Sequence, residues 1–285
     1  MFHTRITVRC PASLSEILIA ELAEVGFEAF LETPEGFEGY AEGDKYDDLA
    51  VDDLFHRYEG HVNDLSFSID RVEKANWNAI WENSYEPVVV DDRCLIRAAF
   101  HKPERAYPHE IIITPKMSFG TGHHPTTRLM IRAQLDMDHQ GKRVLDAGCG
   151  TAILSIMATK LGASEVHAVD PDEWSVINGA ENARLNGCDN IILYQGITRE
   201  QSFPEPFDII LANINKNVLI EDMEWYAHHL RPGAELLLSG FYQTDIGDVL
   251  GHAERTGLGF LRRYEEDDWA ALLLQKDDNV EKQLP

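Results

Sequence analysis

The sequence predicts an α/β protein in which a small α+β domain precedes a large, doubly wound domain. Three observations support this prediction. Apolar, strand-like segments alternate with helix-length segments over most of residues 143–256, an order that favours a parallel sheet covered by helices on both faces. A turn that contains Gly148 and Gly150 follows the first of these strands, as in α/β domains that bind ligands at strand ends. Residues 4–72 have a separate strand and helix order of their own.

The composition is that of a globular protein large enough for two cores. The chain has 285 residues and a formal net charge of −24, which disfavours nucleic acid partners and favours basic ones; acidity that serves only solubility explains the charge equally well. The four cysteines include no Cys-x-x-Cys pair, so we expect free thiols and no zinc or redox motif. No apolar run reaches the roughly 18 residues of a membrane span, and the first residues do not resemble a signal peptide. We therefore expect a cytoplasmic protein.

Residues 1–72 are predicted to form a ferredoxin-like domain. Alternating apolar residues at 4–10 indicate a strand, and a capping box at Ser13 and Glu16 opens a helix that ends near Gly26. Two short strands, a second helix and a last strand complete the order β-α-β-β-α-β. These later elements are expected at residues 27–31, 37–41, 46–58 and 65–72.

Residues 73–86 are predicted to form a linker helix. Its Trp77 and Trp81 lie four residues apart and so on one face, which favours packing against a domain over stacking on nucleic acid.

The large domain is predicted to span residues 87–285. After several short strand-like pieces and a loop at 117–125, a helix begins near Thr126. Five strands alternate with helices from there on, and an acidic turn near the end of the chain joins the two strands of a hairpin. Together these segments predict a seven-stranded, Rossmann-like sheet. The five alternating strands are expected at residues 144–147, 165–170, 191–195, 207–213 and 235–239.

The glycine turn is the strongest candidate for a ligand site. Gly148 and Gly150 let a ligand approach the backbone closely, and Asp170, which is 20 residues after Gly150, offers an acceptor for ribose hydroxyls. A dinucleotide motif would have a third small residue where this chain has Ile153. Asp146 adds a negative charge beside the helix N-terminus, which disfavours a pyrophosphate and favours a cationic ligand.

Polar residues that surround this turn are further candidates. Asn213 ends the fourth strand of the series, where its oxygen can accept a hydrogen bond from an amine; a simple turn residue is the alternative. Thr127 follows a glycine-rich loop and can hold a ligand, or Thr126 or Thr127 can simply cap the next helix. The adjacent His123 and His124 lack a third ligand at zinc spacing, so we expect them to be loop residues, and proton acceptance is a secondary hypothesis.

Combined, these motifs resemble those of known enzymes. The segment 146–150 is similar to the first motif of class I S-adenosylmethionine-dependent methyltransferases, whose cofactor carries a sulfonium and no phosphate. Related amine methyltransferases often continue the fourth strand with Pro-Pro and an aromatic residue. Neither follows Asn213, which argues against a nucleobase substrate and for a flexible primary amine. The loop 120–127, the glycine turn, the strand end at Asp170 and the segment 212–214 together resemble the ribosomal protein L11 methyltransferases.

This resemblance covers the whole chain and implies a fold, a cofactor and a reaction. Members of the family transfer methyl groups from S-adenosylmethionine to lysine ε-amines and to the N-terminal α-amine of ribosomal protein L11. Their small domain recognises this basic substrate, and the linker lets that domain reorient. From its place at the strand end, Asn213 is predicted to be catalytic and to orient the amine for an SN2 displacement. We expect no metal, no nucleic acid partner and no membrane. The resemblance implies cofactor contacts at Thr127, Gly148, Asp170 and Asn213, and the glycine turn itself adds Asp146 and Gly150 to the predicted contacts.

Two departures from the family pattern leave alternatives open. Ala152 replaces a glycine, and because alanine disfavours positive φ, we expect that cofactor binding requires a right-handed helical backbone there. Lys216 either repels a cationic substrate amine or points to solvent. The alternatives are a non-catalytic factor that binds a ribosomal protein, and a methyltransferase for RNA, another basic protein or a small amine.

Overall fold

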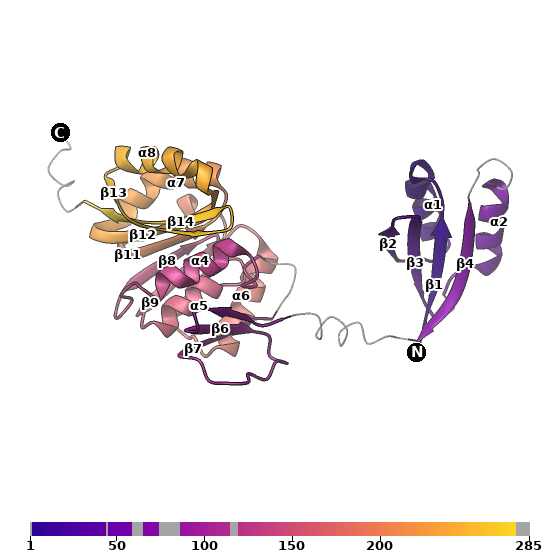
Figure 1. Cartoon of the computed structure of the whole chain (residues 1–285), viewed down its shortest axis with the longest axis horizontal. Helices are drawn as coiled ribbons and strands as arrows, with labels where there is room; N and C mark the ends of the chain where they lie inside the picture. Colours follow the sequence, from indigo (N-terminus) through magenta and orange to yellow (C-terminus); the bar gives the residue numbers. More distant parts are fainter. Residues whose placement is uncertain (1, 44, 59–64, 74–85, 115–118, 278–285) are drawn as a thin grey trace. The chain divides into compact units, whose positions relative to one another are not determined.

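The computed structural model describes residues 2–43, 45–58, 65–73, 86–114 and 119–277 (Figure 1). The chain divides into two compact units, Met1–Tyr85 and Glu86–Pro285. Most of the linker helix predicted at residues 73–86 lies outside the described residues. Among the described helices, none combines the length and the apolar character needed to cross a membrane.

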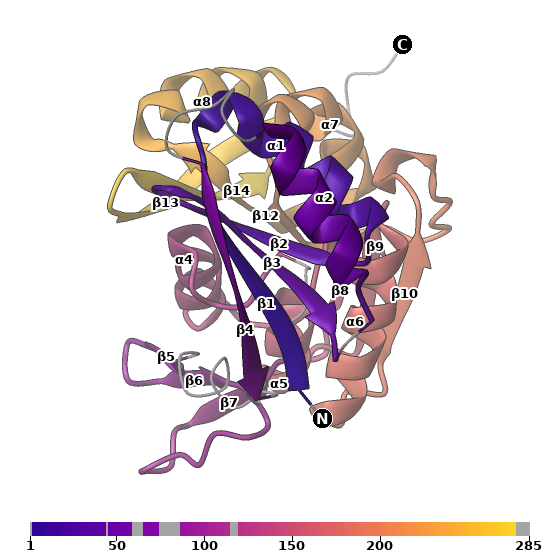
Figure 2. The ribbon, with the colours of Figure 1, turned by 90° about the vertical axis from the view of Figure 1, so that its right-hand side faces the viewer.

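The first unit has the β-α-β-β-α-β order predicted from its sequence. Its described elements are β1 (Phe2–Arg9), α1 (Ala12–Glu24), β2 (Ala29–Thr33), β3 (Gly36–Glu42), α2 (Asp48–Tyr58) and β4 (Ser66–Glu73). The strands pair antiparallel in the order β2-β3-β1-β4, which is the ferredoxin-like arrangement (Figure 2).

One apolar core holds the first unit together. Alternation along β1 places Ile6 and Val8 on the same face of the sheet, where both are buried. Leu18 of α1 and Leu54 of α2 join the same cluster, so both helices cover that one face. The predicted capping box is wrong, because α1 begins at Ala12 directly after Pro11 and Ser13 therefore lies inside its first turn.

The second unit contains the predicted seven-stranded sheet. Preceding it are β5 (Val88–Val90), β6 (Cys94–Arg97) and β7 (His109–Ile112), which form a small separate sheet, and then α4 (Pro125–Gln134). The remaining helices and strands are β8 (Arg143–Ala147), α5 (Ile153–Lys160), β9 (Glu165–Asp170), α6 (Glu173–Leu185), β10 (Ile191–Gln195), β11 (Phe207–Asn213), α7 (Lys216–His229), β12 (Leu230–Tyr242), α8 (Ile246–Arg255), β13 (Leu258–Glu266) and β14 (Trp269–Lys276).

The strand order within this sheet creates a crevice at its centre. The order is β10-β9-β8-β11-β12-β14-β13, in which β10 to β12 run parallel and β14 pairs antiparallel with both of its neighbours. From β8 the chain proceeds first to one side, through β9 and β10, and then to the other, through β11 and β12. Ligands bind at such a switch point, beyond the carboxyl ends of the strands. Here the switch point lies between β8 and β11.

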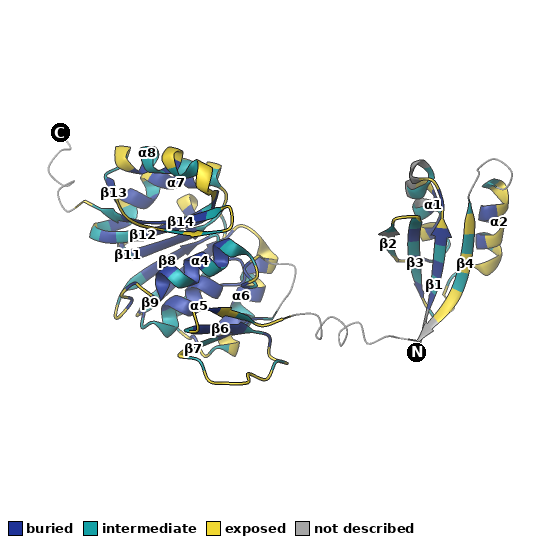
Figure 3. Ribbon diagram, viewed as in Figure 1, coloured by how far each residue is buried: buried dark blue, intermediate teal, exposed yellow. Residues whose placement is uncertain are grey.

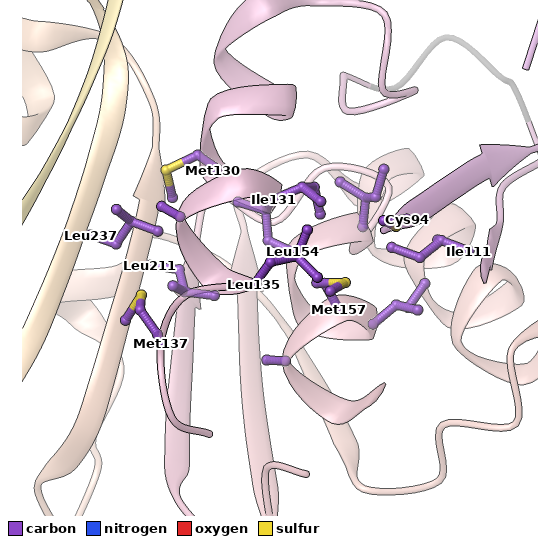
Figure 4. Close-up of a cluster of buried hydrophobic side chains, with 14 of the residues drawn as sticks. Cys94, Ile111, Met130, Ile131, Leu135, Met137, Leu154, Met157, Leu211 and Leu237 are labelled. Carbon is purple, nitrogen blue, oxygen red and sulfur yellow. The ribbon is translucent and has the colours of Figure 1, made fainter. Parts of the chain in front are cut away.

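Helices cover both faces of the sheet, as Figure 1 shows with α7 and α8 on one side and α4, α5 and α6 on the other. Successive residues of β11 alternate between the two layers. Ile209 and Leu211 belong to the cluster under α4 and α5, of which Figure 4 labels Leu211, and Ile210 belongs to the cluster under α7 and α8. The central strands are accordingly buried on both faces (Figure 3). A sheet buried in this way gives the strand ends around the crevice a rigid base.

Candidate active site

A cavity of about 480 Å³ opens at the switch point of the sheet. The glycine turn after β8 and the end of β11 contribute to its wall, and so do residues that follow β9 and begin β14. Four of the six predicted site residues line it: Gly148, Gly150, Asp170 and Asn213. The other two, Thr127 and Asp146, are fully buried and are not among the lining residues.

The glycines of the turn are required by close contacts with two other segments. Both have positive φ, 75° at Gly148 and 50° at Gly150. A Cβ atom on Gly148 would lie 2.3 Å from Cγ2 of Ile214, and one on Gly150 would lie 2.4 Å from the carbonyl oxygen of Phe119. The turn is therefore packed against the segment after β11 and against the loop before α4, both of which line the cavity.

Ala152 corrects one expectation from the sequence. Its backbone has φ 61° and ψ 23°, which is left-handed, whereas we expected that cofactor binding would require a right-handed helical backbone. It precedes the first residue of α5, and its carbonyl accepts a hydrogen bond from the amide of Ile156 at 2.9 Å. The chain thus retains a conformation suited to glycine, at a cost of roughly 1–2 kcal/mol for a residue with a Cβ atom.

Asp170 connects the end of β9 to the glycine turn. Its Oδ2 accepts a hydrogen bond from the amide of Gly150 at 2.8 Å, and its Oδ1 accepts one from the amide of Asp172 at 3.0 Å. Each carboxylate oxygen has two acceptor sites, so these bonds leave capacity for the hydroxyl groups of a ligand. The residue is therefore positioned both to fix the turn and to contact a ribose.

Asp146 caps α5 from a neighbouring strand. Its Oδ2 accepts hydrogen bonds from the amide of Ser155 at 3.0 Å and from its hydroxyl at 2.6 Å, whereas the buried Oδ1 has no partner among the described residues. Burial raises the pKa of Asp146 to about 7, and nearby Asp170 adds to the rise while the bonds from Ser155 oppose it. Near neutral pH the negative charge predicted here is thus only partly present.

Replacing Asp146 with asparagine should remove a pH-dependent part of the stability. Because the native pKa lies above the unfolded value of 3.8, the native state holds this proton more tightly, so the contribution is greatest at low pH and is lost as pH rises towards 7. The free energy of unfolding of Asp146→Asn minus that of wild type should therefore be larger at pH 8 than at pH 5, by roughly 2–3 kcal/mol, because only the wild type loses stability over this range. Urea unfolding of both proteins at the two pH values measures this difference. If the difference in free energy of unfolding between the two proteins is the same at pH 5 and pH 8, the pKa of Asp146 is not raised.

Asn213 presents an unpaired acceptor. It is the last residue of β11, and its buried Oδ1 has no hydrogen-bond partner in the described part of the chain. A buried carbonyl oxygen without a partner costs roughly 1–3 kcal/mol, so its presence at a cavity wall indicates a group that is satisfied when a ligand binds. The sequence-based role of Asn213 as an acceptor for an amine N–H is compatible with this geometry.

The loop before α4 contributes in a way that the sequence did not reveal. The N-cap of α4 is His124, whose Nδ1 lies 3.3 Å from the amide of Thr126, so the expectation that Thr126 or Thr127 caps the helix is wrong. Thr126 lines the cavity, whereas the buried hydroxyl of Thr127 has no partner among the residues described. Helix periodicity alone cannot decide which of two adjacent threonines faces a cavity.

Aromatic side chains form one wall of the cavity. The ring of His124 lies 5.3 Å from that of Phe119 and 4.7 Å from that of Trp269, and Trp269 in turn lies 4.3 Å from Tyr242 (centroid distances). Burial, followed by the nearby Arg128, lowers the pKa of His124, so its ring is neutral at pH 7. The loop that carries Phe119 and His124 is distant in the sequence from Tyr242 and Trp269, so only the tertiary fold brings the two pairs together.

Lys216, for which the sequence left open repulsion of a substrate amine or a side chain that points to solvent, is partly exposed and paired with two carboxylates. Its Nζ lies 2.8 Å from Oδ1 of Asp245 and 3.4 Å from Oδ2 of Asp248, and this pairing raises its pKa. The positive charge is therefore compensated by two carboxylates, and repulsion of a substrate amine is reduced accordingly.

The cavity suits the cationic cofactor that the sequence motifs imply. None of its described lining residues is a lysine or arginine, and His124 is neutral. The wall instead offers the Asp170 carboxylate, the unpaired oxygen of Asn213, aromatic rings, and a glycine turn that a Cβ atom would obstruct. Such a set of acceptors and π faces favours a positively charged ligand with hydroxyl groups and disfavours a phosphate.

The fold and this site together define an α/β methyltransferase. The family model described as "Ribosomal protein L11 methyltransferase (PrmA)" matches residues 30–277. The chain belongs to the ribosomal protein L11 methyltransferase family, which confirms the resemblance stated from its motifs.

Individual relatives agree with this assignment. The chain is 43% identical over 265 residues to the ribosomal protein L11 methyltransferase of Porphyromonas gingivalis, an alignment that covers 92% of this chain and 91% of the relative. It is 40% identical over 272 residues to that of Bacteroides thetaiotaomicron, with 95% and 96% covered. A crystal structure of a ribosomal protein L11 methylase from Lactobacillus delbrueckii subsp. bulgaricus matches with a TM-score of 0.63 and 25% identity, covering 68% of this chain and 100% of that one.

Proposed function

We propose that this protein transfers methyl groups from S-adenosylmethionine to lysine ε-amino groups and the N-terminal α-amino group of ribosomal protein L11. Family membership supports the reaction class. The observation that carries the proposal is the unpaired, buried Oδ1 of Asn213 in the wall of a cavity without a lysine or arginine among its described lining residues. It is an acceptor that an incoming amine would satisfy.

Each group at the site has a role in this proposal. When bound, S-adenosylmethionine supplies an electrophilic methyl group on a positively charged sulfur. Asp170 holds ribose hydroxyls, and the glycine turn fits closely against the cofactor. Asn213 accepts a hydrogen bond from the substrate amine and thereby directs its lone pair. The catalytic contribution of the protein is mainly positioning.

The substrate amine must be neutral when it reacts. A lysine in solution is protonated at pH 7, but its removal from water into the cavity lowers its pKa. The aromatic wall of Phe119, His124 and Trp269 provides an environment poor in water for the aliphatic part of the lysine side chain. No separate general base is required if the proton leaves to solvent before the amine is fully enclosed.

The charge of the chain supports a basic protein as substrate. At a formal net charge of −24 the surface attracts basic proteins and increases their rate of association. Because ribosomal proteins are made where ribosomes assemble, we place the reaction in the cytoplasm, in keeping with the four buried, free cysteines.

Methyl transfer to purified L11 tests the proposal directly. The protein, S-adenosylmethionine with a radiolabelled methyl group, and L11 should yield labelled L11, and mass spectrometry should place the added methyl groups on lysines and on the N-terminus. An equally basic ribosomal protein serves as the control for substrate choice. If L11 binds but gains no label, the protein is a non-catalytic binding factor; if only another substrate is labelled, the proposed substrate is wrong.

A further inference from the structure

Three exposed apolar residues lie near the cavity without being among its lining residues, and none of them has a role in the proposed reaction. Trp174 of α6 is 73% exposed, and Ile177 of α6 and Ile197 after β10 are each 41% exposed. We call these three residues the Trp174 patch. Ile197 follows β10, which packs against α6, so the three side chains belong to neighbouring elements. Large exposed apolar side chains that gather in this way mark interaction sites.

The positions of neighbouring residues place the patch at the rim of the cavity. Trp174 and Ile177 are one helical turn apart and lie on the same face of α6. Ser175, next to Trp174, lines the cavity. The amide of Gly196 donates a hydrogen bond to the carbonyl of Asp170 at 2.9 Å, so Ile197 continues from the strand end that borders the same cavity.

The surface around the patch is acidic. Asp172 and Glu173 precede Trp174 directly, and Glu200 follows Ile197 closely; all three are exposed. The one nearby cation in this stretch, Arg199, is paired with Glu221 and with Asp222, at 2.5 and 3.1 Å. An apolar centre with an acidic rim matches a partner that presents basic side chains, because their aliphatic stems pack on the ring while their charges meet the carboxylates.

We propose that the Trp174 patch is a contact surface on the catalytic unit for the basic protein substrate, which holds the substrate while one of its amines enters the cavity. This inference rests on the proposed function and adds the surface by which that substrate is held. Tryptophan is among the residues enriched at the energetic centres of protein contacts, and here it lies near the cavity. The patch thus acts on substrate affinity and not on the chemical step.

The Trp174→Ala variant separates these two effects. Because the side chain is mostly exposed, the variant should fold as wild type does, and its KM for L11 should rise roughly tenfold. Its kcat and its Kd for S-adenosylmethionine should remain within about twofold of wild type. Phe260→Ala is the matched control: Phe260 is 51% exposed on β13, which is at the opposite edge of the sheet from β10, and its removal should leave all three constants unchanged. An unchanged KM in Trp174→Ala overturns the proposal, while labelling of L11 by the wild type would still support the proposed function.

Acrylamide quenching identifies what covers the patch. The fluorescence of Trp174 is obtained as the difference between wild type and Trp174→Phe. It should be quenched efficiently in the free protein and with S-adenosylmethionine, and should be protected when L11 is added. If S-adenosylmethionine alone protects Trp174 from quenching, the side chain contacts the cofactor. If Trp174 is already protected in the free protein, another part of the chain or a second copy occupies the patch. Either result overturns the proposal, and protection by L11 without methyl transfer would uphold the patch while refuting the proposed reaction.

Discussion

Replacing Asn213 with alanine should lower the rate of methyl transfer to L11 by ~100-fold, which corresponds to about 2.7 kcal/mol of lost transition-state stabilisation. The Oδ1 atom of Asn213 is buried at the wall of the cavity and has no partner among the described residues, so a substrate amine is the group that would satisfy it. Without this acceptor the amine can still enter, but its lone pair is no longer directed. The loss should therefore appear in kcat, and the Kd for S-adenosylmethionine measured by calorimetry should change much less.

A second buried asparagine provides the control. Asn190 also has a buried, unpaired Oδ1, and its Nδ2 donates to the carbonyl of Ala163 at 2.8 Å. It lies just before β10, at the opposite end of the parallel strands from the cavity. Asn190→Ala should therefore lower the melting temperature but leave kcat unchanged at 25 °C. If Asn213→Ala keeps its kcat, or if it loses cofactor affinity to the same extent as rate, Asn213 does not direct the amine.

The main features of the fold could be predicted because they depend on local patterns. The strands around Asp146, Asp170 and Asn213 are continuous apolar runs, and the helices between them have the length that a parallel crossover needs. The carboxyl ends of such strands must meet at one edge of the sheet, so the sequence also predicted that Asp170 and Asn213 would share a site. Both residues line the same cavity.

The parts that could not be predicted depend on contacts between distant segments. The sequence shows that Lys216 is near the site, but not that Asp245 lies 2.8 Å from it. It shows a tryptophan at position 269 without indicating that this ring meets His124 at the start of α4. Ala152 was expected to avoid a positive φ on local grounds, yet its φ is 61° where the turn packs against the Phe119 loop. In each case tertiary contacts override or complete the local preference.

Replacing Gly150 with alanine should abolish most cofactor binding and lower the free energy of unfolding by roughly 3 kcal/mol. The new Cβ atom would lie 2.4 Å from the carbonyl oxygen of Phe119, and this is a backbone atom that cannot rotate away. The same carbonyl accepts a hydrogen bond from the amide of Thr151 at 2.9 Å, so the turn and the loop that carries Phe119 are directly joined. Relief of the clash must move one of them, and both line the cavity.

Gly187→Ala distinguishes this effect from the general cost of a Cβ atom at positive φ. Gly187 has φ 67°, but a Cβ atom there would meet no other atom within 4 Å. This variant should therefore lose only the roughly 1 kcal/mol that a left-handed alanine costs, and it should bind S-adenosylmethionine as wild type does. Calorimetry and thermal unfolding of the two variants measure both quantities. If the two variants lose the same stability and Gly150→Ala still binds S-adenosylmethionine as wild type does, the contact between the turn and the Phe119 loop does not shape the binding site. A loss of affinity specific to Gly150→Ala would mean that the cavity depends on the turn being closed against this loop.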